Sequence, residues 1–309
     1  MKYLFRENNN EVKVNKILDL YRKLLNETNN RSKCIMLIVP NATSKLNYER
    51  ELNIDISEEL NITTYSSFIK REIIKFWPLI TEKCNQIINK SISPIFIPSS
   101  LSEYIIINKV NEQRNASGYF QDITGTNRSI ANSISNNINK AALALIDFKT
   151  IGEKIYLSKK NRDSIMRFSY SQMDEIIDYY INKLLENSMI DNSIAIYLYE
   201  NYLINDDRYI NHLSQEIKYL IIDSLESCSN AEVNFINSLS NYTLGTYIYF
   251  NKTKDYSVFN NIDALIYSRL FVNVMTADPA SRHPTPYHFD RSRNAGRKLP
   301  PRQRQAAPP

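Results

Sequence analysis

The chain has 309 residues, of which 43 % are hydrophobic, enough to bury the core of one large domain or two smaller ones. Three widely spaced cysteines without a CxxC pair argue against a disulfide framework or a zinc site, and a reducing cytoplasm fits them best. No apolar run approaches the roughly 18 residues that a membrane span needs, so no membrane partner is expected.

Charge and composition divide the chain near residue 276. Of the 38 basic and 33 acidic residues, seven basic and two acidic ones lie in 276–309, so the 31 basic and 31 acidic residues of 1–275 leave the body neutral. The segment 276–309 also holds seven of the 11 prolines, and its composition predicts a disordered, basic, proline-rich tail. The arginines of this tail fit a nucleic-acid arm, a merely solvated segment, a fusion scar or a shifted reading frame.

The first part of the chain alternates predicted strands and helices. Tyr3–Phe5 is predicted to form a short buried strand, and apolar residues at helical spacing predict a helix over Val12–Asn26. The apolar run Cys34–Val39 ends at Pro40, which is typical of a strand that is covered on both faces. The pattern then predicts a helix, a short strand and a second helix over Ser44–Leu52, Ile62–Thr64 and Ser66–Phe76.

A long helical interval separates these elements from a second alternating part. Residues 80–217 have a mainly helical pattern, and buried strands over Tyr219–Asp223 and Thr246–Phe250 follow, with a helix over Ala231–Leu239 between them. This alternation predicts an α/β fold with a parallel sheet and helices on both faces. The expected domains are a sheet domain in two parts and a large inserted helical subdomain, with boundaries 1–79, 80–217 and 218–275.

One predicted strand delivers an aspartate to its C-terminal end. The run Tyr219–Ile222 is followed directly by Asp223, and ligands of open parallel sheets bind at the edge where the strands end. An aspartate in this place can hold magnesium. The alternative is that Asp223 is a turn residue or a helix cap.

Four segments of the chain occur in the order of helicase motifs. They are Ile35–Lys45 (IMLIVPNATSK), Ile62–Phe68 (ITTYSSF), Tyr219–Asn230 (YLIIDSLESCSN) and Thr246–Asp263 (TYIYFNKTKDYSVFNNID). Together they resemble the first motor domain of UvrD/Rep-type superfamily-one DNA helicases, over about residues 1–265. That family inserts its helical subdomain between the second and third segments. The resemblance implies a RecA-like sheet, a site for ATP and magnesium, and single-stranded DNA as the partner.

The resemblance places several departures on the nucleotide side. Asp223 matches the magnesium aspartate of the family, but Ser224 stands where the family has the glutamate that activates water. Glu226 is the candidate for a substitute base, and a solvated helix cap is the alternative. Lys254 occupies the position of the glutamine that senses the γ-phosphate, and Asn251 that of an aspartate.

The phosphate-binding loop is also absent in its usual form. A strand, a loop and a helix are predicted where a GxxxxGK[ST] loop would lie, but Arg6–Glu11 (RENNNE) contains no glycine and no lysine followed by Ser or Thr. Glu7 and Glu11 would repel a phosphate. ATP and magnesium are therefore implied by the resemblance but are not expected to be used by this chain alone.

The positions that face the polynucleotide in the family differ less from the family's residues than the nucleotide-side positions do. Thr64 matches the threonine of the second segment, with Ser66 in place of a histidine, and Asn41 and Lys45 lie in the segment that tracks the strand backbone. Phe259 matches the aromatic residue on which the family stacks a base, a contact worth about 1–3 kcal/mol. The alternative, favoured by a neutral body, is that Phe259 and Tyr65 are core aromatics.

Two functions remain open from the sequence. The first is a helicase-like DNA-binding protein of repair or recombination with a degenerate or incomplete ATP site, acting alone or with a helicase or nuclease partner subunit. The second is a non-enzymatic scaffold whose tyrosine-rich helical insert docks a protein partner. Tyr197, Tyr199 and Tyr202 would then form an exposed apolar patch, although their helical spacing also suits core packing.

Overall fold

The computed structural model describes residues 1–52, 59–251, 275–276 and 285–286. Its strands are β1 (Lys2–Arg6), β2 (Ile35–Ile38), β3 (Ile62–Thr63), β4 (Ile95–Phe96), β5 (Met189–Ile190), β6 (Tyr219–Ile222), β7 (Gly245–Phe250), β8 (Met275–Thr276) and β9 (Thr285–Pro286). Its helices are α1 (Asn10–Glu27), α2 (Ala42–Glu51), α3 (Tyr65–Lys75), α4 (Trp77–Lys83), α5 (Ser99–Ser117), α6 (Asn127–Ala144), α7 (Ile151–Ser158), α8 (Ser164–Glu186), α9 (Asn192–Leu198), α10 (Asp207–Glu216) and α11 (Asn230–Ser240).

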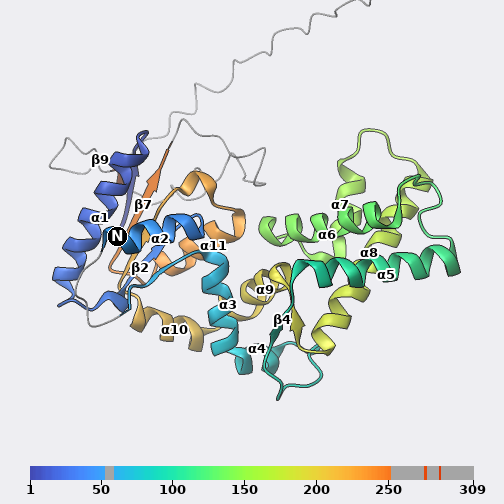
Figure 1. The fold of residues 1–309 in the computed structure, drawn as a ribbon, viewed down its shortest axis with the longest axis horizontal. Helices are drawn as coiled ribbons and strands as arrows, with labels where there is room; N and C mark the ends of the chain where they lie inside the picture. Colours follow the sequence, from blue (N-terminus) through green and yellow to red (C-terminus); the bar gives the residue numbers. More distant parts are fainter. Residues whose placement is uncertain (53–58, 252–274, 277–284, 287–309) are drawn as a thin grey trace, which may run out of the picture.

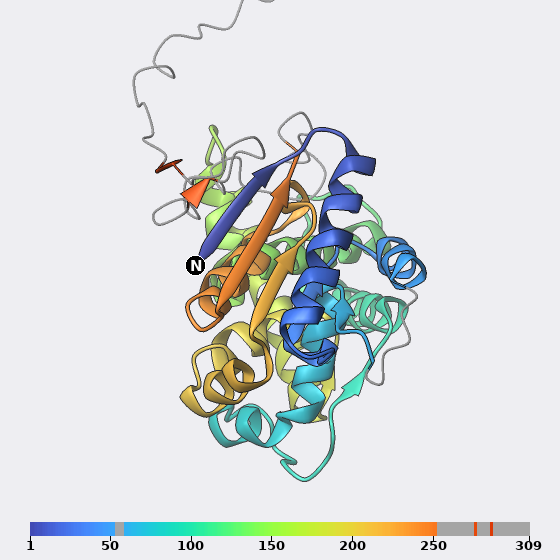
Figure 2. The same cartoon turned by 90° about the vertical axis from the view of Figure 1, so that its left-hand side faces the viewer.

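The main sheet has the strand order β3-β2-β6-β7-β1-β8-β9. Strand β6 lies between β2 and β7, with Ile221 opposite both Leu37 and Tyr247. Every pair from β3 to β8 is parallel, and the β8–β9 pair is antiparallel. Figure 2 shows β1 and β7 running side by side in the same direction. The predicted parallel sheet is therefore confirmed, with the predicted strands near 35–39, 219–223 and 246–250 next to one another.

Helices cover both faces of the sheet, as predicted. Alternate residues of a strand point to opposite faces, and in β2 this separates Ile35 and Leu37 from Met36 and Ile38. The first pair packs in a cluster with α1 and α2, and the second pair packs in a cluster with α3 and α11. Because β2 is buried on both faces, its sequence is apolar at every position.

Polar residues at the strand ends start the following helices. Asn9, Asn41 and Thr64 are the N-caps of α1, α2 and α3, and each side chain accepts a hydrogen bond from a backbone amide of the first turn. Helix α11 begins with a capping box of Ser229 and Glu232. These caps place the helix N-termini at the end of the sheet where the strands finish.

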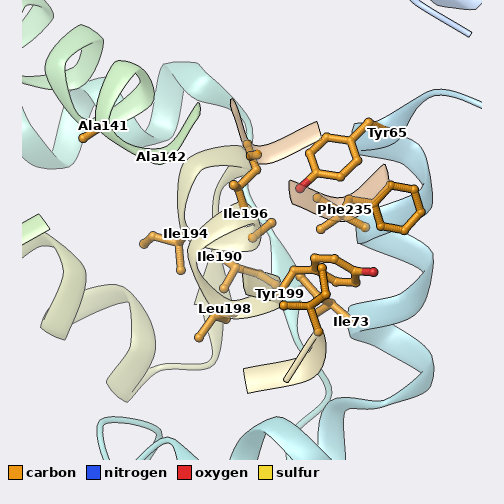
Figure 3. Packing of buried hydrophobic residues seen from close by; sticks show 14 of the residues in the cluster. Tyr65, Ile73, Ala141, Ala142, Ile190, Ile194, Ile196, Leu198, Tyr199 and Phe235 are labelled. Carbon is orange, nitrogen blue, oxygen red and sulfur yellow. The ribbon is translucent and has the colours of Figure 1, made fainter. Parts of the chain in front are cut away.

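The interval between β3 and β6 is mainly helical, as predicted. It also contains a small parallel pair of strands, β4 and β5, which was not predicted because each has only two residues. Helices α5 to α8 lie on the side of the molecule away from the sheet (Figure 1). The core is continuous across this interval, and Figure 3 shows Tyr65, Tyr199 and Phe235 packing together, with ring centroids 5.7 to 6.5 Å apart.

The tyrosines of the interval pack into this core. Tyr199 is fully buried, whereas Tyr197 and Tyr202 are partly buried and lie against the core cluster. Tyr65 is also buried, as the core alternative for this residue predicted. Of the predicted tail 276–309, the structure describes only Thr276 and the strand Thr285–Pro286, and the prediction of disorder concerns residues outside the described part of the chain.

Candidate functional site

Five parallel strands end at one edge of the sheet, and their following residues form the candidate site. These are the strands β1, β2, β3, β6 and β7. The chain leaves this carboxyl edge toward both faces of the sheet. Strand β2 leads to α2 on one face, and β6 leads to α11 on the other. In open α/β sheets, ligands bind in the crevice at such a point.

A buried ion pair lies at the centre of this edge. The Lys13 Nζ atom, in the first turns of α1, is 2.6 Å from the Asp223 Oδ1 atom at the end of β6. The two side chains are only 4 % and 5 % exposed. A buried carboxylate needs a cation or several donors to offset its lost hydration. Here the cation that Asp223 contacts is a lysine of the same chain.

Ser224 connects the two charged groups. Its Oγ atom accepts a hydrogen bond from Lys13 Nζ at 2.5 Å and donates one to Asp223 Oδ1 at 2.9 Å. Its backbone is left-handed, with a φ of 66°, a conformation that non-glycine residues seldom adopt. Such local strain is held by surrounding contacts and is concentrated at functional sites.

Tyr48 closes the other side of the aspartate. Its hydroxyl, on α2, donates to Asp223 Oδ2 at 3.2 Å. Burial, together with the negative charge of Asp223, raises the pKa of Tyr48 far above its usual range, so that the phenol keeps its proton. Both oxygens of the Asp223 carboxylate are thus occupied by side chains of α1, α2 and the adjacent Ser224.

Glu226 has a structural partner at the same edge. It is 4 % exposed, and its Oε2 atom accepts the backbone N–H of Asn251 at 3.0 Å. The side-chain Nδ2 group of Asn251 donates to the carbonyl oxygen of Asn8 at 3.0 Å. The interpretation of Glu226 as a solvated helix cap is therefore wrong, because the carboxylate is buried and joins the ends of β7 and β6.

The loop after β1 has no phosphate-binding character. The Glu7 carboxylate forms an ion pair of 2.5 Å with Lys16, and the Asn9 side chain caps α1. Helix α1 begins at Asn10, two residues earlier than predicted, because this cap satisfies the first free amides. The side chains of Glu7 and Asn9 are thus bonded to α1.

Sequence reasoning missed Lys13. Counted from Glu7, the residues Val12, Lys13 and Val14 occupy the last three positions of the G-x-x-x-x-G-K-[ST] spacing. A search for lysine followed by Ser or Thr rejects this position, since Val14 has no hydroxyl. The spacing of six residues between the end of the strand and the lysine was the signal that could have found it.

The described residues of the predicted DNA path lie on adjacent elements. Asn41 accepts from the Ser44 amide at 2.9 Å and Thr64 from the Ser67 amide at 3.3 Å. Lys45 lies one turn into α2, 3.6 Å from Glu49, and Ser66 is partly exposed in the first turn of α3. The structure thus brings these four residues to the carboxyl edge. Lys254 and Phe259 lie outside the described residues.

No known protein family matches the sequence, and no curated protein matches it either. Within the described ranges, none of the helices is long and apolar enough to cross a membrane. The same part of the chain contains no cluster of three or more His, Cys, Asp or Glu side chains suited to a metal ion.

Proposed function

We propose that this chain is a helicase-like DNA-binding protein of DNA repair or recombination, with a RecA-like sheet, a helical insert over 80–217 and a closed nucleotide site. The observation that carries the proposal is the buried Lys13–Asp223 pair. It joins the helix after the first strand to the aspartate after β6, which are the two parts that bind phosphate and magnesium in the resembling helicases.

The same pair argues against hydrolysis of ATP. In a P-loop the lysine reaches the β- and γ-phosphates, and the aspartate helps to hold the magnesium ion. Here the ammonium group lies against the carboxylate, which also accepts from Tyr48 and Ser224. A magnesium ion would have to displace a buried cation. The residues present therefore do not fit Mg–ATP, and Ser224 offers no general base.

Support for a DNA path comes from two helix N-termini. Helices α2 and α3 follow the adjacent strands β2 and β3, so their first turns lie at the same edge. Free amides and the helix dipole at such termini favour phosphate groups. The caps Asn41 and Thr64 would border this path. A helicase or nuclease subunit is the partner that the resemblance implies.

The scaffold alternative loses its main support. It rested on an exposed apolar patch over Tyr197–Tyr202, but Tyr199 is buried and its neighbours pack on the core. None of Tyr197, Tyr199 and Tyr202 is among the exposed large apolar side chains of the described residues. We therefore retain DNA binding as the proposed function.

The test is the binding of a labelled single-stranded oligonucleotide to the full chain. Asn41→Asp and Thr64→Asp together keep good N-caps but add two negative charges at the edge. We expect affinity to fall about tenfold at low salt, because phosphate contacts dominate such binding. Thr126→Asp adds a negative charge at the cap of α6, in the helical interval, and serves as the control.

Two results would count against the proposal. The first is no binding by the wild-type chain even at low salt. The second is binding that is equally strong in the Asn41→Asp/Thr64→Asp variant, which would place the DNA contacts away from the strand ends. Circular dichroism of each variant checks that the fold is retained.

A further inference from the structure

A basic hairpin stands out from the neutral body of the chain. The span 149–168, which covers α7 and the start of α8, contains six basic and two acidic residues. The basic residues are all exposed in the structure: Lys149, Lys154, Lys159, Lys160, Arg162 and Arg167. None of them forms an ion pair with a carboxylate of the described residues. Their charges are therefore available to an anionic partner.

The hairpin is held rigidly against the rest of the helical interval. The Asp174 carboxylate, on α8, accepts from the backbone amides of Gly152 at 2.6 Å and Glu153 at 3.2 Å. A Cβ atom at Gly152 would lie 2.2 Å from the Tyr170 carbonyl oxygen, so glycine permits the close contact between α7 and α8. Lys154 and Arg167 lie on the two packed helices, and Lys159, Lys160 and Arg162 lie in the connection between them.

Apolar side chains are exposed among these charges. Phe168 is 69 % exposed, Ile165 is 64 % exposed, and Leu157 is 49 % exposed. This apolar strip is short, since Gln172, the next residue on the same side of α8, is already buried. A helix that lies in a membrane interface buries one large continuous apolar face, which these three side chains do not form. An exposed aromatic ring beside several lysines is instead the combination that binds single strands by stacking and phosphate contacts.

We propose that the α7–α8 hairpin is a second contact surface for single-stranded nucleic acid, with Phe168 as a stacking platform and the lysines of the hairpin on the phosphates. The inference rests on the proposed function, because it assumes that the chain binds a polynucleotide. It adds a surface in the helical interval that is separate from the strand ends. The strand would then contact the protein at two places, which increases its overall affinity.

The experiment measures the affinity of the full chain for a labelled oligothymidylate of about 40 nucleotides across a range of salt concentrations. Lys154→Gln, Lys159→Gln and Lys160→Gln together remove three charges of the hairpin. The control removes three exposed lysines elsewhere, through Lys23→Gln, Lys90→Gln and Lys140→Gln, with the same change in net charge.

We expect the hairpin triple variant to bind about 10- to 100-fold more weakly at low salt, with the slope of log affinity against log salt reduced by about 2. The control should change affinity by less than about threefold. Phe168→Ala should weaken binding about 5- to 100-fold. Tyr104→Ala, which removes a ring that is 60 % exposed on α5, is its control and should have little effect.

Four outcomes would overturn the inference. Equal losses in both lysine triple variants would mean that only net charge matters. Normal DNA binding in the hairpin variants, while the Asn41→Asp/Thr64→Asp variant is impaired, would remove the hairpin surface but keep the proposed function. Hairpin variants that lose binding to phosphatidylserine vesicles, but not to DNA, would assign the surface to a membrane. If the wild-type chain does not bind DNA at all, both proposals fail.

Discussion

Replacing Lys13 by methionine should destabilise the protein strongly, because it leaves the Asp223 carboxylate buried without a cation. Both side chains are at most 5 % exposed and their charged atoms are 2.6 Å apart. Removing one partner of a buried pair typically costs about 3–5 kcal/mol. Asp223 would retain hydrogen bonds from Tyr48 and Ser224, so we expect about 3 kcal/mol, at the lower end of that range.

The assay is thermal and urea unfolding followed by circular dichroism. At about 2–4 °C per kcal/mol for a chain of this size, Lys13→Met should lower the melting temperature by roughly 6–12 °C. Lys16→Met, one turn away on α1, is the control. The Lys16 side chain is 38 % exposed, so its ion pair with Glu7 should contribute at most about 1 kcal/mol to stability.

A double variant separates the pair from general damage to the helix. Lys13→Met combined with Asp223→Asn should cost clearly less than the sum of the two single changes, because no charge is then left unpaired. Additive losses, or a Lys13→Met variant as stable as Lys16→Met, would refute the reasoning that the two charges depend on each other.

Three further changes test neighbouring parts of the structure. Tyr48→Phe removes one hydrogen bond to the carboxylate and should cost about 1.5–3 kcal/mol in urea unfolding. Gly152→Ala should cost about 1–3 kcal/mol in the same assay, because its Cβ atom would meet Tyr170, whereas Gly125→Ala meets nothing closer than 3.7 Å and should be mild. Burial raises the pKa of Glu200, so its folded form binds the proton more tightly and stability is lost as pH rises through that raised pKa. In Glu200→Gln the melting temperature should therefore fall less between about pH 5 and about pH 8, and an unchanged profile would contradict this.

Much of the sheet could be predicted because its central strands are continuous apolar runs in the sequence. The continuous apolar runs of β2 and β6 require burial on both faces. The helices after β2 and β3 begin at Ala42 and Tyr65, slightly earlier than predicted, because Asn41 and Thr64 are their N-caps. The helical interval was predicted from the same periodicity. Short elements such as β4 and β5 have only two residues, and their pairing depends on contacts between positions about 94 residues apart.

The candidate site could be predicted only in part. Asp223 and its place at the end of a strand follow from the local pattern, but its partner Lys13 is 210 residues earlier and has no local signal other than its spacing. The partner of Glu226 is also distant in the sequence, because its carboxylate accepts from the backbone amide of Asn251. Residue types can therefore indicate where charges lie along the chain, but the fold decides which of them neutralise each other.

The most direct test of a closed nucleotide site is phosphate release by the purified full chain with ATP, magnesium and single-stranded DNA. The Lys13–Asp223 pair, Ser224 and a loop without glycine lead us to expect no release above background, and no change on Asp223→Ala in a variant that still folds. Turnover near about one per second that Asp223→Ala abolishes would contradict the closed site, because it would show that magnesium can displace the lysine.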